Sequence, residues 1–175
     1  MFKTIFALAL IGAACGALLF VINAVTAIDI EKNRTQKARA IMSDLLKRPL
    51  AEKISWLDDI SGDCEMGYFI KHTENGYSGP IRFLALYTPA KSTLERPKEQ
   101  LSLRVTYHQE TPGIGDFIDH KRAPYLVNLD RLEPEQWGAL DNISGATITH
   151  RAIKKAASNI QTTGKYHQKK NACGK

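Results

Sequence analysis

The sequence predicts an α+β protein in which one N-terminal transmembrane helix precedes a single extracytoplasmic domain, whose mixed or antiparallel sheet is flanked by helices. Three observations support this class. Residues 4–28 carry no charge, residues 81–87 and 101–107 alternate apolar and polar side chains, and one later segment has helical spacing of Ile153, Ala156, Ala157 and Ile160. With 175 residues, the chain has the length of one domain and an appendage.

The appendage is the uncharged run, which we expect to be a transmembrane anchor over residues 1–28. About 20 apolar residues suffice to cross a bilayer. Lys3 precedes the run, and Asp29 and Glu31 follow it. Because positive charge stays on the cytoplasmic side, the bulk of the chain is predicted to lie outside the cytoplasm.

A cleaved signal peptide is the alternative interpretation of the same segment. Val25-Thr26-Ala27 has the small residues that are typical of a cleavage site. The apolar run is longer than the hydrophobic region of a signal peptide, so we favour a retained anchor.

A connecting helix is predicted over residues 29–50, ahead of one domain over residues 51–175. The apolar positions that give the helix its periodicity, over about residues 31–47, are Ala38, Ile41, Met42, Leu45 and Leu46. Pro49 is expected to end this helix. Residues 56–64 are acidic and predicted to be a loop.

Three strands and a final helix are predicted within the domain. The strands are residues 67–72, 81–87 and 101–107, with a turn at residues 74–80 and a polar, proline-containing connection at residues 88–99. The helix covers residues 151–160, and Thr147 or Thr149 is its expected N-cap.

Charge and the spacing of histidine and cysteine argue against nucleic-acid binding and against a metal site. The net charge of +6 is spread along the chain and carries no nucleic-acid signal. The histidines lack ligand spacing and no Cys-x-x-Cys is present, so no metal or iron–sulfur site is expected. Cys64 and Cys173 form an even pair in an oxidising compartment, which suggests a disulfide, although two unpaired thiols remain the alternative.

Two loops are the candidate binding elements. Ser144-Gly145-Ala146-Thr147 leads into the last helix, and a helix start favours phosphate through its free N–H groups and its dipole. The stretch Glu110-Thr111-Pro112-Gly113-Ile114-Gly115 makes a tight turn whose glycines permit close approach of a flat ring. Taken alone, either could be an ordinary loop, and neither is a P-loop or a dinucleotide fingerprint.

Together these motifs resemble the FMN-binding domain family, which includes the G subunit of the Rnf (Rsx) complex and the C subunit of the sodium-translocating NADH:quinone reductase. Asp-x-x-Ser-Gly-Ala-Thr resembles the family's flavinylation motif, and Glu-Thr-Pro-Gly-Ile-Gly resembles its Glu-Thr-Pro-Gly-Leu-Gly loop. The anchor, the Gly76-Tyr77-Ser78-Gly79 turn and the Ala-Cys-Gly ending extend the resemblance over essentially the whole chain. The resemblance is closer to the Rnf G subunit than to the reductase subunit, which is typically larger.

The resemblance implies that Thr147 carries FMN through a phosphoester, placed there by a separate flavin transferase that uses FAD and a divalent metal. Asp141 belongs to the transferase's recognition motif, and Thr149 is expected to be a bystander. The expected environment of the ring and the phosphate comprises Tyr77, Glu110, Thr111, Gly113, Gly115, Ser144, Gly145 and Ala146.

The function implied is that of an electron-transfer subunit, not a catalyst on its own, because the cofactor supplies the redox chemistry. The resemblance places it in the bacterial inner membrane, with its bulk in the periplasm and with the other membrane subunits of an Rnf-type complex as partners. That complex couples electron flow between NADH and ferredoxin to ion translocation. The alternative is a flavin-free, membrane-anchored assembly subunit. A hydrolase is not supported, because no nucleophile and base are singled out by spacing.

Overall fold

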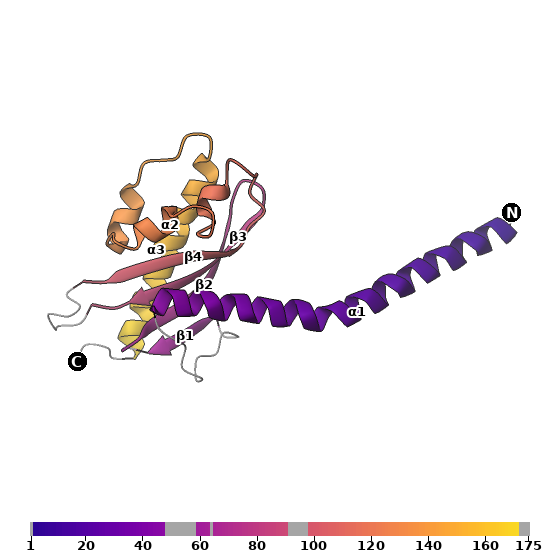
Figure 1. Cartoon of the computed structure of the whole chain (residues 1–175), viewed down its shortest axis with the longest axis horizontal. Helices are drawn as coiled ribbons and strands as arrows, with labels where there is room; N and C mark the ends of the chain where they lie inside the picture. The colour runs from indigo at the N-terminus through magenta and orange to yellow at the C-terminus, as the bar shows by residue number, and fades with distance from the viewer. Residues whose placement is uncertain (1, 48–58, 64, 91–97, 172–175) are drawn as a thin grey trace. The chain divides into compact units, whose positions relative to one another are not determined.

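The computed structural model describes residues 2–47, 59–63, 65–90 and 98–171. It confirms the α+β class: one long N-terminal helix and an open four-stranded antiparallel sheet with helices (Figure 1). The chain divides into two compact units, residues 1–37 and residues 38–175. Cys64 and Cys173, the expected disulfide pair, and Pro49, the expected helix end, lie outside the described residues.

The first helix, α1 (Phe2–Leu46), runs without a break from the predicted anchor into the predicted connecting helix and ends at Leu46. By length and composition it contains a stretch apolar enough to cross a membrane, with a mean hydropathy of 2.7. Its side chains from Ile5 to Ile28 are exposed, as expected of a surface that meets lipid instead of a protein core. Only its last turns, from Ala38 onwards, belong to the folded domain.

The sheet is an antiparallel meander in the order β1-β2-β3-β4. Its strands are β1 (Ile60–Asp63), β2 (Gly67–Asn75), β3 (Pro80–Thr88) and β4 (Gln100–Tyr107). The three predicted strands are confirmed. The loop predicted over residues 56–64 is wrong at residues 60–63, because these form β1 by pairing with β2, Ile60 opposite Ile70. Such a pairing leaves no local pattern in a four-residue segment.

The final helix, α3 (Thr147–Lys170), covers one face of the sheet. Its fully buried Ile153, Ala156 and Ile160 pack against inward side chains of β2, β3 and β4 such as Phe83 and Leu103. The opposite face of the sheet contacts the end of α1, where Ile41, Met42 and Leu45 pack against Phe69, Leu84 and Leu86. The two-residue alternation of the strands therefore supplies two separate apolar clusters.

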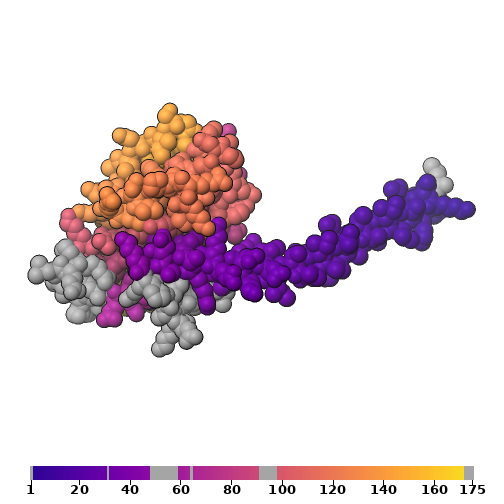
Figure 2. Space-filling view, in the orientation of Figure 1, coloured from indigo at the N-terminus to yellow at the C-terminus, as the bar shows by residue number. Residues whose placement is uncertain are grey.

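Between β4 and α3 the chain forms only short helices: η1 (Asp116–Ile118), α2 (Tyr125–Leu129) and η2 (Pro134–Ala139). Figure 2 shows this orange segment spread over one side of the domain. It is fastened by the buried Ile118, Leu126 and Trp137, which join the cluster beneath α3. Arg104 of β4 adds a bidentate contact to Asp130, at 3.0 and 2.6 Å.

A buried histidine joins this segment to the first turns of α3. His150 is completely buried, and its Nε2 lies 2.5 Å from the Tyr125 hydroxyl. Its other ring nitrogen has no hydrogen-bond partner within the described part of the chain. Burial, with a smaller contribution from the charge of Lys154, lowers the pKa of His150 below its ordinary value.

This burial makes the stability of the domain depend on pH. A histidine whose folded pKa is lowered binds its proton more readily in the unfolded state, so stability is complete above about pH 6.5 and falls as the pH drops towards the folded pKa. We expect the melting temperature to fall between about pH 7 and about pH 5, and to fall less in His150→Gln. The melting temperatures are measured by circular dichroism. An equal fall in the wild-type protein and in His150→Gln would show that His150 does not cause the pH dependence.

The packing of α3 on the sheet predicts an unusual response to a helix-favouring substitution. A Cβ added at Gly164 would lie 2.3 Å from the Tyr87 ring. We expect Gly164→Ala to lower the free energy of unfolding, because overpacking costs about 1–3 kcal/mol and outweighs a propensity gain of at most about 1 kcal/mol. Gly138→Ala, where nothing lies within 4 Å of the added Cβ, is the matched control for urea unfolding. Stabilisation by Gly164→Ala would refute the prediction.

Candidate flavin-binding site

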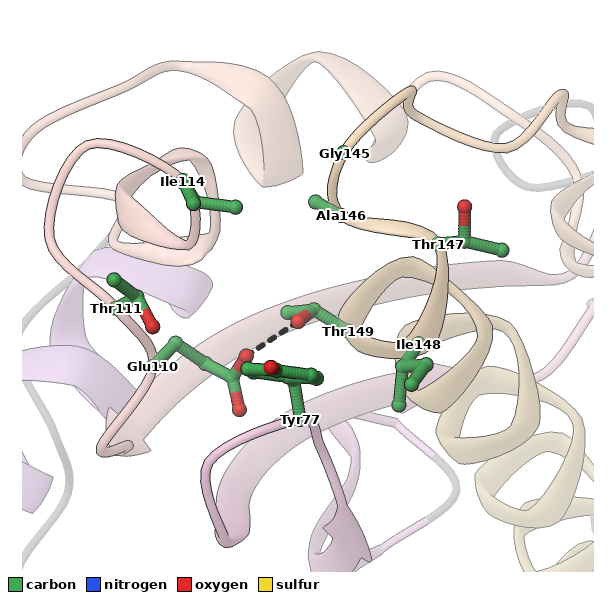
Figure 3. A pocket seen from close by; sticks show the side chains of 9 residues that line it. All are labelled: Tyr77, Glu110, Thr111, Ile114, Gly145, Ala146, Thr147, Ile148 and Thr149. Carbon is green, nitrogen blue, oxygen red and sulfur yellow. Dashed lines mark hydrogen bonds between the residues drawn. The ribbon is translucent and has the colours of Figure 1, made fainter.

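The two candidate loops meet at the start of α3, where they enclose a cavity of about 330 Å³. That volume is within the range of small-molecule sites. Three segments distant in sequence form its walls: the turn after β2, the loop after β4 and the first turn of α3 (Figure 3). Its lining residues are Tyr77, Glu110, Thr111, Ile114, Gly145, Ala146, Thr147, Ile148 and Thr149.

The start of α3 offers free backbone donors to this cavity. Gly145 has φ +80°, a left-handed conformation that turns the chain into the helix with little strain because glycine lacks a Cβ. The N-cap is Ala146, whose side chain makes no capping hydrogen bond. The predicted capping by Thr147 or Thr149 is therefore wrong. Uncapped N–H groups in a first helical turn suit a phosphate group.

The two threonines of the first turn differ in environment. Thr147 is half-buried, and its hydroxyl is directed away from Glu110 in Figure 3. Thr149 is 2% exposed, and its hydroxyl donates a hydrogen bond to Glu110 Oε2. Two residues along an α-helix differ by roughly 200° in direction, so the side chains lie on different sides of it. Thr147 is thus the more accessible hydroxyl at the cavity.

Glu110 forms the buried floor of the cavity, between Tyr77 and Thr149 (Figure 3). Its second carboxylate oxygen, Oε1, accepts a hydrogen bond of 3.1 Å from the backbone N–H of Ser78. The loop after β4 and the turn after β2 are therefore joined through one side chain. Buried polar groups normally have such partners, because an unpaired one is costly.

The rim of the cavity is apolar and open. Tyr77, Ile114 and Ile148 are exposed by 71%, 54% and 49% of their surface, although each lines the cavity. Exposed large apolar side chains gathered around a hollow are typical of a binding site for a partly apolar ligand. An aromatic ring and two aliphatic side chains can cover a flat heterocycle, while the helix start faces a phosphate.

Six of the nine predicted binding residues line the cavity: Tyr77, Glu110, Thr111, Gly145, Ala146 and Thr147. The other three do not. Ser144 is exposed and precedes the cavity wall. Gly113 has φ +82° and donates its N–H to the Asp116 carboxylate at 3.0 Å. Gly115 lies behind Glu110, and a Cβ there would be 2.2 Å from the Glu110 Cβ.

Three lining residues, Ile114, Ile148 and Thr149, were not predicted from the sequence as part of the binding site. For Thr149 a signal existed, because it lies four residues before Ile153 and so continues the buried stripe of α3 towards the helix start. A polar residue on a buried stripe needs a polar partner, and that partner is Glu110. No local pattern distinguishes Ile114 or Ile148 from other surface residues.

Comparison with known proteins agrees with this arrangement. The family model described as FMN-binding domain matches residues 76–161, which include every lining residue. The G subunit of the ion-translocating oxidoreductase complex of Shewanella baltica is 27% identical, over 91% of this chain and 87% of its own length.

Similar relatives occur in other bacteria. The corresponding protein of Pasteurella multocida is 27% identical, over 83% of this chain and 84% of its own. The G subunit of Aliivibrio fischeri is 29% identical, over 86% of this chain and 74% of its own length. Residues 76–161 therefore match the FMN-binding domain model, and most of the chain is similar to the G subunits of ion-translocating oxidoreductase complexes.

Proposed function

We propose that this chain carries FMN covalently on Thr147 and acts as an electron-transfer subunit of an ion-translocating oxidoreductase complex. The observation that carries the proposal is the cavity at the start of α3, which joins an uncapped helical turn, an accessible Thr147 hydroxyl and an apolar rim. A phosphate and a flat, partly apolar ring are the two parts of FMN that these features fit.

Different parts of the cavity would hold the phosphate and the ring of the cofactor. The N–H groups of the first turn of α3 would bind the phosphate, and Tyr77, Ile114 and Ile148 would shield the ring from water. When bound, FMN supplies the electron-carrying chemistry, and the protein orients it and adjusts its electronic surroundings.

Attachment would follow the scheme that the resemblance implies. The Thr147 oxygen attacks the flavin-side phosphorus of FAD, an oxygen–phosphorus bond forms, and the bond from that phosphorus to the AMP moiety breaks. AMP leaves, and the hydroxyl proton passes to a base of the flavin transferase. Thr149 is a poor acceptor in this scheme, because its hydroxyl is buried and already donates to Glu110.

Placement in the membrane is the second part of the proposal. The apolar part of α1 would anchor the chain in the bacterial inner membrane, and the flavin domain would lie on the periplasmic side, since Lys3 precedes the apolar run. The other membrane subunits of the complex would be its partners, and electrons exchanged between NADH and ferredoxin would pass through them. A covalent tether suits that side of the membrane, where a lost flavin is not easily replaced.

The modified residue can be identified by mass. We expect the full chain, produced with a flavin transferase in detergent, to gain the mass of one FMN less one water. Thr147→Ala should gain none, because it lacks the attacking oxygen, whereas Thr147→Ser should recover the modification. Thr149→Ser keeps a hydroxyl at the neighbouring position and is the matched control.

Two outcomes would contradict this assignment. An unmodified wild-type chain under these conditions would exclude the covalent carrier and favour the flavin-free assembly subunit. A modified Thr147→Ala protein, with the flavin located on Thr149 by tandem mass spectrometry, would retain the carrier function but reject Thr147 as its attachment site.

A further inference from the structure

Glu110 is an uncommon feature at the floor of a cofactor cavity, because it is a carboxylate that is only 6% exposed. No lysine, arginine or histidine pairs with it among the described residues. It is held instead by two neutral donors, the Ser78 N–H and the Thr149 hydroxyl. Both contacts use it as an acceptor, which fits the ionised carboxylate.

The surrounding backbone is shaped to keep this side chain in one position. A Cβ on Gly76 would lie 2.2 Å from Glu110 Oε1, and a Cβ on Gly115 would lie 2.2 Å from the Glu110 Cβ. Two glycines therefore leave room for this side chain at close range, Gly76 beside its carboxylate and Gly115 beside its Cβ. Together with the two donors, they restrict both the rotation of the side chain and its withdrawal from the cavity.

We propose that Glu110 is a fixed negative charge that lowers the reduction potential of FMN in this site, and that Thr149 is the positioning residue that holds it there. The inference rests on the proposed function. Two-electron reduction adds two electrons and one proton to the flavin and leaves the anionic reduced form. A negative charge in the cavity floor opposes this added charge, and burial strengthens the repulsion because water screens it less.

Thr149 acts through Glu110 and not on the cofactor itself. Its hydroxyl is the donor that α3 contributes, and it aligns the carboxylate with the helix start that bears Thr147. Without that donor, one carboxylate oxygen loses its partner in a buried place, which favours movement of the side chain away from the cavity floor. Such movement takes part of the fixed charge out of the cavity.

The test is a redox titration of the covalently loaded full chain in detergent, with dithionite as the source of electrons and solvent as the source of protons, at one fixed pH. The variants are Glu110→Gln, which removes the charge, Thr149→Val, which removes the donor at similar shape, and Thr149→Ser, which keeps the donor. Glu133→Gln is the control, because it removes a surface carboxylate that does not line the cavity. Intact mass verifies one FMN per chain in each protein.

Glu110→Gln is expected to shift the oxidised-to-reduced ratio at least tenfold towards the reduced form, which is a rise of about 30 mV for a two-electron couple. Thr149→Val should shift the potential in the same direction. The double variant should not exceed Glu110→Gln, because both substitutions act on one charge. Thr149→Ser and Glu133→Gln should keep the wild-type potential.

A purely structural role would give a different pattern. Glu110→Gln and Thr149→Val would then lower the melting temperature of the flavin-free protein but leave the reduction potential of the loaded protein unchanged. That result would overturn the proposed role of Glu110 and leave the proposed function intact. Failure of both variants to acquire FMN, while Glu133→Gln acquires it, would also overturn it, in favour of a role in assembling the site. A wild-type chain that acquires no FMN would overturn the proposed function and this inference together, and the mass spectrum distinguishes that case.

Discussion

The packing of α3 against the sheet is the contact on which the site depends. Ile153, Ala156 and Ile160 are fully buried against three strands, and Gly164 lets the helix approach the Tyr87 ring. Burial of each of the two isoleucine side chains contributes on the order of 1.5–3 kcal/mol, so the helix has little freedom to shift. Its first turn is thereby fixed beside the loop that follows β4.

The same geometry separates the two chemical tasks of the first turn of α3. Residues on the buried stripe of the helix pack against the sheet, and Thr149, at the start of this stripe, lines the cavity. Thr147 lies on another side of the helix, where its hydroxyl is available for modification. One threonine is held inside the site and the other is accessible at it, because a helix rotates by about 100° per residue.

The long connection between β4 and α3 has little regular structure, yet it is packed against the core of the domain. Ile118, Leu126 and Trp137 bury their side chains in the main cluster, and Arg104 binds Asp130 through two hydrogen bonds. This attachment supports the wall that carries Ile114. The redox partner of a bound flavin must reach the ring, so a well-packed scaffold with an open rim suits an electron-transfer subunit.

The α+β class, three of the four strands, the membrane-length apolar run and the two loops that form the site could be predicted from the sequence, because they depend on local composition and periodicity. Strand β1, the absence of a side-chain cap on α3 and the Glu110–Thr149 contact were decided only by the tertiary structure. Strand β1 exists only through its pairing with β2, and the contact between Glu110 and Thr149 joins residues that are 39 positions apart. Local pattern identifies a residue that needs a partner, but the fold decides which partner it finds.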